Sequence, residues 1–302
     1  MFANDTHPAD YPTVRAVEYF GDLITRRSDG RLSIKMFAGG QLGSERDTLE
    51  ITAFGGLDIN RVNIAPLNAI EPLTMIPSLP FLFDSIAHSR RALDGAPGRA
   101  ILESLAPHGL IGLCYYDSGA RSFYNTHHPV RTPDDMRGWK FRVQNSDLYV
   151  GMIKALGADA TPMGLGEVYQ GLVQGVIDGA ENNWPSYQSE RHFEVAPFYS
   201  ETQHVMAPEV LLMSKARWDK LSSSDREIII ESARESVPYM RKLWDARVIS
   251  ARKDVIAAGV KANPVDRASF RALTHPLWDR FVTSDHGRAL VRQIQDMGEG
   301  DA

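Results

Sequence analysis

Residues 225–259 read DREIIIESARESVPYMRKLWDARVISARKDVIAAG, and their periodicity constrains how the whole chain is organised. Apolar or small side chains recur in steps of three and four, at positions 233, 237, 240, 244, 248, 251, 255 and 258. That spacing predicts one helix of about 35 residues, or roughly 50 Å at 1.5 Å per residue. A domain of about 150 residues is narrower, roughly 30–40 Å. We therefore expect the helix to pack on two halves of the molecule, with Pro238 bending it or lying at a tolerated break.

The remainder of the chain alternates helix-period and strand-period segments, which predicts an α/β fold with mostly parallel sheets. The run LIGLCYY at 110–116 is apolar throughout, as expected for a parallel strand covered on both faces. Further strands are expected near 32–36, 57–62, 139–143, 159–161 and 176–180, with helices near 14–29, 146–156 and 166–174. No flexible linker separates the halves, so structured crossings that permit hinge bending should join them.

Composition narrows the classes of function. The chain has 302 residues, 43% hydrophobic and 24% charged, with a formal net charge of -5 and no long basic stretch. This is an ordinary globular composition, and a nucleic-acid partner is not expected. The single cysteine, Cys114, is expected in the core. The sequence contains no run of about 18 apolar residues, the length needed to span a membrane. The chain carries no signal peptide, and its abrupt start at Met1-Phe2 suggests a processed or engineered beginning.

Enzymatic signatures are missing from the sequence. It contains no P-loop, no G-x-G-x-x-G opening a helix, no G-x-S-x-G elbow and no H-E-x-x-H. Paired-carboxylate catalysis stays open, because carboxylates are plentiful and no pair stands out. We expect no catalytic residues, no bound metal and no cofactor.

Two arginines and an asparagine stand where open α/β sheets place ligands. Arg142 lies within WKFRVQNS (139–146) at a strand-to-turn transition, Arg121 follows the 110–116 strand, and Asn182 follows the strand GVIDGAE. The planar fork of arginine matches a carboxylate bidentately. The alternative for each arginine is an internal ion pair, and for Asn182 a turn or helix cap before Trp184-Pro185.

Several segments together resemble a known family. GGQLGSERDTLE (39–50), SLPFLFDSIAH (78–88), PDDMRGWKFRV (133–143) and LGADATPMGLGEVYQGLVQGVIDGAENN (156–183) are similar to the extracytoplasmic solute-binding proteins of TRAP transporters, the DctP type. The resemblance runs from about residue 2 to about 285. It implies a two-lobed fold like that of periplasmic binding proteins, with a long helix spanning both lobes. We expect residues 1–120 and 208–247 in the N-terminal lobe, residues 121–207 and 248–302 in the C-terminal lobe, and a ligand cleft between them.

The resemblance also implies roles for individual residues. Arg142 would clamp a ligand carboxylate, Arg121 would add a second cationic contact, and Asn182 would reach the same carboxylate. The N-terminal lobe would contribute Glu45, Asn63 and His7. Two further candidates come from the residues themselves: Glu209 as an acceptor of ligand hydroxyls, and Asn145 as either a helix cap or a ligand contact.

These polar groups favour one class of ligand. A short aliphatic or aromatic acid would leave several of them unpaired, at about 1–3 kcal/mol for each buried orphan. Glu45 and Glu209 suit hydroxyls and would repel a second carboxylate, so a sugar acid is expected, led by glucuronate and galacturonate. Asparagine at position 63 counts against sialate, because the sialate-binding branch carries an acid there.

The resemblance further implies a monomeric periplasmic protein, with its signal peptide removed, that delivers its ligand to TRAP permease subunits in the membrane. Alternatives are a ligand-sensing domain of the same fold, a binder of a C4-dicarboxylate or another organic acid, and an enzyme acting on sugar acids. A neighbouring permease gene would favour transport, and a fused kinase or cyclase would favour sensing. Recovery of the ligand unchanged would exclude the enzyme.

Overall fold

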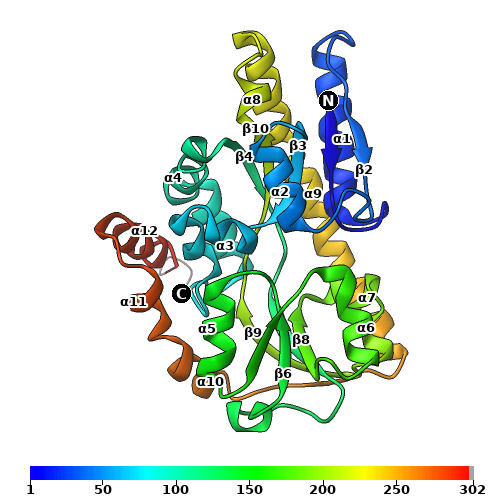
Figure 1. Cartoon of the computed structure of the whole chain (residues 1–302), viewed down its shortest axis with the longest axis vertical. Coiled ribbons are helices and arrows are strands. Elements are labelled where there is room, and N and C mark those ends of the chain that lie inside the picture. Colours follow the sequence, from blue (N-terminus) through cyan, green and yellow to red (C-terminus); the bar gives the residue numbers. More distant parts are fainter. Residues whose placement is uncertain (299–302) are drawn as a thin grey trace.

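A computed structural model describes residues 1–298 and contains two sheets (Figure 1). In the first sheet the order is β2 (Lys35–Phe37), β1 (Phe2–Asn4), β3 (Ile59–Asn63), β10 (Glu209–Ser214), β4 (Leu110–Tyr116). In the second it is β11 (Lys261–Asn263), β9 (Phe198–Val205), β5 (Arg121–Asn125), β8 (Gly179–Asn182), β6 (Lys140–Val143), β7 (Asp159–Pro162). The predicted α/β class is therefore confirmed.

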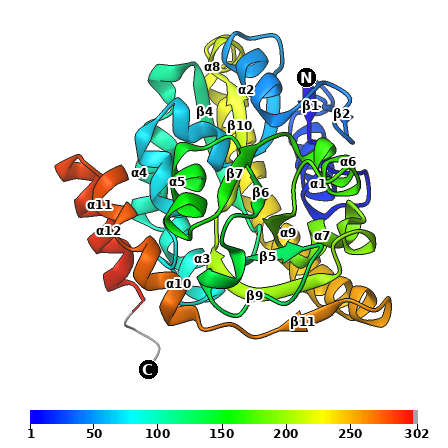
Figure 2. The ribbon, with the colours of Figure 1, turned by 60° about the horizontal axis from the view of Figure 1, so that its bottom comes forward.

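Helices cover the faces of both sheets (Figures 1 and 2). Around the first sheet lie α1 (Pro12–Arg27), α2 (Glu45–Ala53), α3 (Ile86–Asp94), α4 (Ala96–Glu103), α8 (Lys215–Trp218) and the 3₁₀ helices η1 (Ala65–Ala69) and η2 (Pro72–Ser78). Around the second lie α5 (Asp147–Ala155), α6 (Val168–Val173), α7 (Trp184–Ser189) and α10 (Arg267–Thr274). The chain then continues through α11 (Leu277–Phe281) and α12 (Asp285–Asp296).

The long helix predicted from the sequence is α9, Ser223–Ala257, and it continues through Pro238. Its first half, from Ile229 to Trp244, packs in one core cluster with residues of α1 and the first sheet. Its second half contributes Ala251 and Val255 to a different cluster, built on Tyr124 and Tyr199 of the second sheet. One helix thus packs on both sheets because its apolar stripe is longer than either core.

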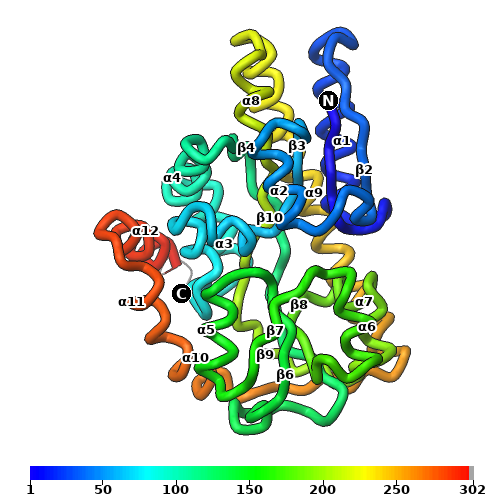
Figure 3. The backbone as a smooth tube through the Cα atoms, viewed as in Figure 1, coloured from blue at the N-terminus to red at the C-terminus, as the bar shows by residue number. Residues whose placement is uncertain are grey.

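Two further connections join the sheets (Figure 3). Residues 117–120 lead from β4 to β5, and residues 206–208 lead back from β9 to β10. The elements of the first sheet fall within residues 1–120 and 208–247, and the strands of the second within 121–207 and 248–302. The helix α12 contacts η2 and α4, beside the first sheet. The proposed lobe boundaries stay a prediction, and residues 299–302 lie outside the described residues.

One expectation about strand pairing is wrong. The run 110–116 is not a central parallel strand: β4 is an edge strand that pairs only with β10, and the pairing is antiparallel. The reason is the return connection, which places β10 between β3 and β4 and antiparallel to both. The run is still apolar because α4 and α9 contact it. Cys114 is buried there, as expected.

No helix within residues 1–298 is both long and apolar enough to cross a lipid bilayer.

Candidate functional site

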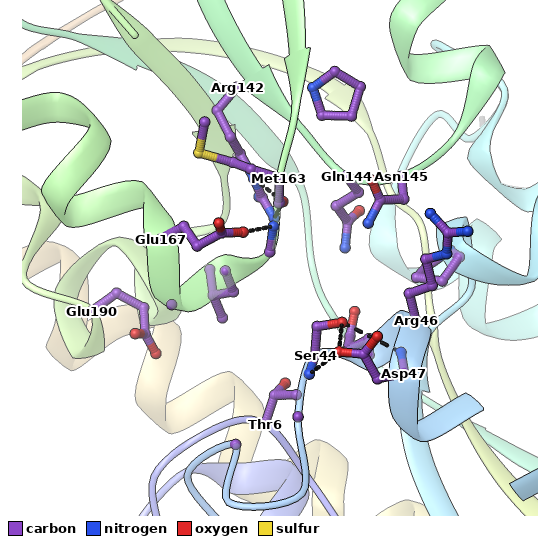
Figure 4. A pocket seen from close by; sticks show the side chains of 18 of the residues that line it. Thr6, Ser44, Arg46, Asp47, Arg142, Gln144, Asn145, Met163, Glu167 and Glu190 are labelled. Atoms are coloured by element: carbon purple, nitrogen blue, oxygen red, sulfur yellow. Dashed lines mark hydrogen bonds between the residues drawn. The ribbon is translucent and has the colours of Figure 1, made fainter. Parts of the chain in front are cut away.

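A cavity of about 730 Å³ opens between elements of the two sheets (Figure 4). One wall comes from the first sheet's side, with Thr6 and the segment 39–47 that leads into α2. The opposite wall comes from the second sheet's side, with the ends of β6 and β7 and with Glu190 at the end of α7. Its volume lies in the range typical of small-molecule sites, about 300–1,000 Å³.

Arg142 is buried in the wall of this cavity without an acidic partner. Its side chain is on β6, and its Nε and Nη2 donate to the Met163 carbonyl oxygen at 3.0 and 2.8 Å. Within residues 1–298, no ion pair joins it to a carboxylate and its Nη1 makes no hydrogen bond. Burial lowers the pKa of its guanidinium, although Glu181 acts in the opposite direction. The cation is desolvated and uncompensated, which favours binding of an anion.

Arg121 is equally buried but fully engaged inside the protein. Its Nε donates to Glu181 Oε2 at 2.5 Å and its Nη2 to Glu181 Oε1 at 2.9 Å. Burial by itself would raise the pKa of the Glu181 carboxyl, but Arg121 and His204 lower it to about 2. Arg121 does not line the cavity. The internal ion pair, which the sequence left open as an alternative, is therefore the arrangement of Arg121 in this structure.

Asn182 belongs to the same buried group. Its side-chain oxygen accepts from Arg121 Nη1 at 3.0 Å and from the Asn183 backbone N–H at 2.9 Å. The helix cap falls to Asn183, whose side chain accepts from the Ser186 N–H at the start of α7. Asn182 does not line the cavity, so its contribution here is to hold the Arg121 guanidinium.

Three predicted residues converge on an arginine that the sequence reasoning missed. Arg61, fully buried on β3, donates from Nη1 to Glu45 Oε1 at 2.9 Å and to Glu209 Oε2 at 2.6 Å. Its Nη2 lies 2.6 Å from His7 Nδ1 and also donates to Asp5. Arg61 and Asn63 are two residues apart on β3, so their side chains lie on the same face of the sheet. This spacing is the sequence signal that could have identified Arg61.

The carboxylates around Arg61 differ in the direction of their pKa shifts. Burial would raise the pKa of Glu209, but Arg61 lowers it below its usual value. For Glu45 burial prevails over Arg61, and the pKa is raised. The Asp5 carboxyl has a strongly lowered pKa, because Arg61 and His7 outweigh its burial. Among Glu45, Glu209 and His7, only Glu45 lines the cavity, and its Oε2 makes no hydrogen bond within residues 1–298.

Asn63 supports this group. Its side-chain nitrogen donates to Glu209 Oε1 at 3.0 Å, and its side-chain oxygen accepts from the Ala65 N–H at 3.1 Å. Both ends of the amide are thus used inside the protein, and Asn63 does not line the cavity.

Asn145 does line the cavity, on the segment after β6. The helix α5 begins at Asp147 with Ser146 as its N-cap residue, so Asn145 is not the cap. Next to it, Gln144 also lines the cavity, and its buried side-chain oxygen has no hydrogen-bond partner in the described chain. Gln144 was not predicted, and neither were Thr6 and Glu190. Burial raises the pKa of Glu190.

The arrangement can bind an anion at Arg142 and hydroxyl groups at several acceptors.

The model of the bacterial extracellular solute-binding protein family 7, DctP, matches residues 3–285. The chain belongs to this family. The resemblance found in the sequence is thereby confirmed.

Individual relatives cover nearly the whole chain. A solute-binding protein of Chromohalobacter salexigens is 45% identical over 293 residues, covering 96% of this chain and 87% of that protein. The 2,3-diketo-L-gulonate-binding periplasmic protein YiaO of Escherichia coli is 32% identical, with 98% and 91% covered.

Solved structures of this family share the fold. A TRAP periplasmic solute-binding protein from Xanthobacter autotrophicus Py2, with bound β-D-galacturonate, is 49% identical and superposes with a TM-score of 0.96 over 98% of this chain and 99% of that one. Another, from Chromohalobacter salexigens with bound D-glucuronate, is 44% identical with a TM-score of 0.95, and the same shares are covered. The expected two-lobed fold with a long helix is confirmed.

Proposed function

We propose that this DctP-family protein captures a hexuronate, galacturonate or glucuronate, and delivers it to a TRAP permease. The observation that carries the proposal is Arg142, a buried guanidinium in the cavity wall that lacks a carboxylate partner among residues 1–298. The other two buried arginines of this part of the chain, Arg61 and Arg121, each have carboxylates at hydrogen-bonding distance.

The free edge of Arg142 suits a carboxylate. Its Nε and one Nη2 hydrogen are directed at Met163 O, which leaves Nη1 and the second Nη2 hydrogen for two parallel hydrogen bonds. The Met163 carbonyl fixes the plane of the guanidinium before the ligand arrives, so little side-chain entropy is lost on binding. Arg121 acts behind it, because its pairing with Glu181 keeps that carboxylate away from Arg142, and Asn182 holds the Arg121 guanidinium in place.

The remaining lining groups suit hydroxyls. Glu45, Glu190 and the unpartnered oxygen of Gln144 are acceptors, and Thr6 and Asn145 can donate as well as accept. The wall carries four carboxylates, those of Glu45, Asp47, Glu167 and Glu190. They would repel a second carboxylate on the ligand, which favours a sugar acid over a C4-dicarboxylate. The uronates bound in the two related structures have one carboxylate and several hydroxyls, which agrees with this division.

Delivery to a permease would follow from closure of the two lobes around the ligand. Ligand contacts from both walls are made together only when the lobes are close, so the ligand favours the closed form by its differential affinity. We propose a monomer that works in the periplasm, with the TRAP membrane subunits as partners and without catalysis of its own.

Calorimetric titration tests this function. We expect D-galacturonate or D-glucuronate to bind at micromolar Kd or tighter, roughly -8 kcal/mol, and D-galactose, D-glucose and succinate to bind far more weakly. The bound sugar acid should be recovered chemically unchanged. Binding of succinate but of neither uronate would refute the proposal.

A further inference from the structure

A second chamber of about 370 Å³ adjoins the cavity. The two share four lining residues, Arg46, Pro66, Asn145 and Pro162, so they lie next to each other. The remaining lining of the chamber is richer in apolar side chains than that of the cavity: Leu49, Ala69, Ile70, Met75 and Val150.

Elements from both sides of the molecule form the chamber. One wall is α2 with η1 and η2, and the other is the start of α5. A buried hydrogen bond from Ser146 Oγ to Asn68 Oδ1, 2.7 Å long, joins the two walls, and both residues line the chamber. Figure 4 shows Arg46 and Asn145 on the same side of the cavity, away from Glu167 and Glu190. The chamber therefore lies beside the cavity on the Arg46 side.

A free monosaccharide presents little apolar area to such a surface, because most of its substituents are hydroxyls. We propose that the chamber binds an apolar substituent carried by the ligand, so that the protein also takes uronate glycosides with an aromatic or alkyl aglycone. This inference rests on the proposed uronate function, since the uronate carboxylate would stay on Arg142 while the aglycone enters the chamber.

The charges in the chamber argue for an apolar substituent over a second uronic acid. Its two carboxylates, Glu50 and Asp147, would repel another carboxylate. Its one cation, Arg46, lies 3.6 Å from Glu50 on the same helix, so its charge is partly compensated. An aryl or alkyl group would instead contact Ile70, Met75 and Val150 and release water from them.

Matched glycosides test the inference on the wild-type full chain. Calorimetry would compare D-galacturonate, D-glucuronate, and the methyl and phenyl glycosides of each acid in both anomeric forms. We expect at least one phenyl glycoside to bind about tenfold or more tightly than its methyl counterpart, because burial of a ring is worth that much. Digalacturonate should bind more weakly than that phenyl glycoside.

A variant assigns the effect to the chamber. Ala69 lines the chamber at an exposed position, so we expect the ring of Ala69→Trp to occupy the chamber and to leave the core intact. We expect the phenyl preference to vanish and the free uronate to keep its Kd within about twofold. The control is Ala257→Trp, at an exposed position on α9. Comparison of the wild-type ligands does not depend on either variant folding.

Each contrary result has a separate meaning. If a free uronate binds but every phenyl glycoside binds no better than its methyl counterpart, the aglycone chamber is refuted and the uronate function stands. If digalacturonate binds most tightly, the occupant is a second sugar and the inference fails. If no uronate binds in any form, the proposed function itself has failed.

Discussion

Arg142 and Glu181 lie on neighbouring parallel strands, β6 and β8, yet the Glu181 carboxylate is bound by Arg121 from the other side. Residue 142 pairs with Ala180, one position before Glu181, so the two side chains point to opposite faces of the sheet at that point. Glu181 instead pairs with Phe123 of β5, the strand that carries Arg121. This one-residue offset is what leaves Arg142 available to a ligand.

Replacement of Arg142 separates binding from stability. Arg142→Ala should abolish measurable uronate binding, and Arg142→Lys should lose most of it, because an ammonium cannot form two parallel hydrogen bonds with a carboxylate. The ligand-free variants should melt no lower than the wild type by more than a few degrees, since a desolvated cation without a counter-ion contributes little stability. Calorimetry and thermal melting measure the two effects. A Lys variant with wild-type Kd would exclude bidentate recognition.

Removal of the Glu181 charge should destabilise the protein. Glu181→Gln leaves the buried Arg121 uncompensated, at a cost of about 3–5 kcal/mol in the free energy of unfolding. Urea unfolding measures this, and Arg121→Met combined with Glu181→Gln should recover part of the loss, because the unpaired charge is gone. Equal stability of Glu181→Gln and the double variant would contradict the assignment of the loss to an uncompensated Arg121 charge.

The same ion pair predicts acid sensitivity. The pKa of Glu181 falls from its ordinary 4.5 to about 2 in the folded protein. A lowered folded pKa contributes stability that is complete above the unfolded value and is lost as the pH falls toward the folded one. The free energy of unfolding should therefore decline from about pH 4.5 to pH 2, and less steeply in Glu181→Gln. Urea titrations at a series of pH values compare the slopes, and identical slopes would contradict the assignment.

Replacement of Arg61 should produce a pH dependence of stability opposite to that caused by Glu181. In Arg61→Met, the buried carboxylates of Asp5, Glu45 and Glu209 lose the cation between them, and burial then raises their pKa values. A raised folded pKa contributes stability at low pH that is lost as the pH rises through it. The variant should be strongly destabilised at pH 8 and regain stability toward pH 5, as measured by thermal melting. Arg15→Met, which removes an exposed ion pair with Glu18, is the control and should show neither effect.

Local patterns predicted much of the fold. The three-and-four spacing of apolar residues marks α9 at its observed length, because a helical stripe is a property of neighbouring residues. Strand and helix periods likewise located β6, α5 and α6. The pairing of β4 escaped prediction, because an apolar run records that a strand is covered and not which strand lies beside it or in what direction.

The same distinction between local patterns and long-range contacts applies to the candidate site. The family, the α/β class, the spanning helix and the candidate Arg142 could be inferred from the sequence alone, since these depend on residue types and their order along the chain. The three-dimensional arrangement was needed to see that Arg121 is paired with Glu181 and that Arg61 contacts Glu45, Glu209 and His7. It was also needed to place Gln144 and Glu190 in the lining of the cavity. An ion pair forms between side chains that strand register and packing bring within a few ångströms, and the residues concerned are separated by up to 148 positions in the chain.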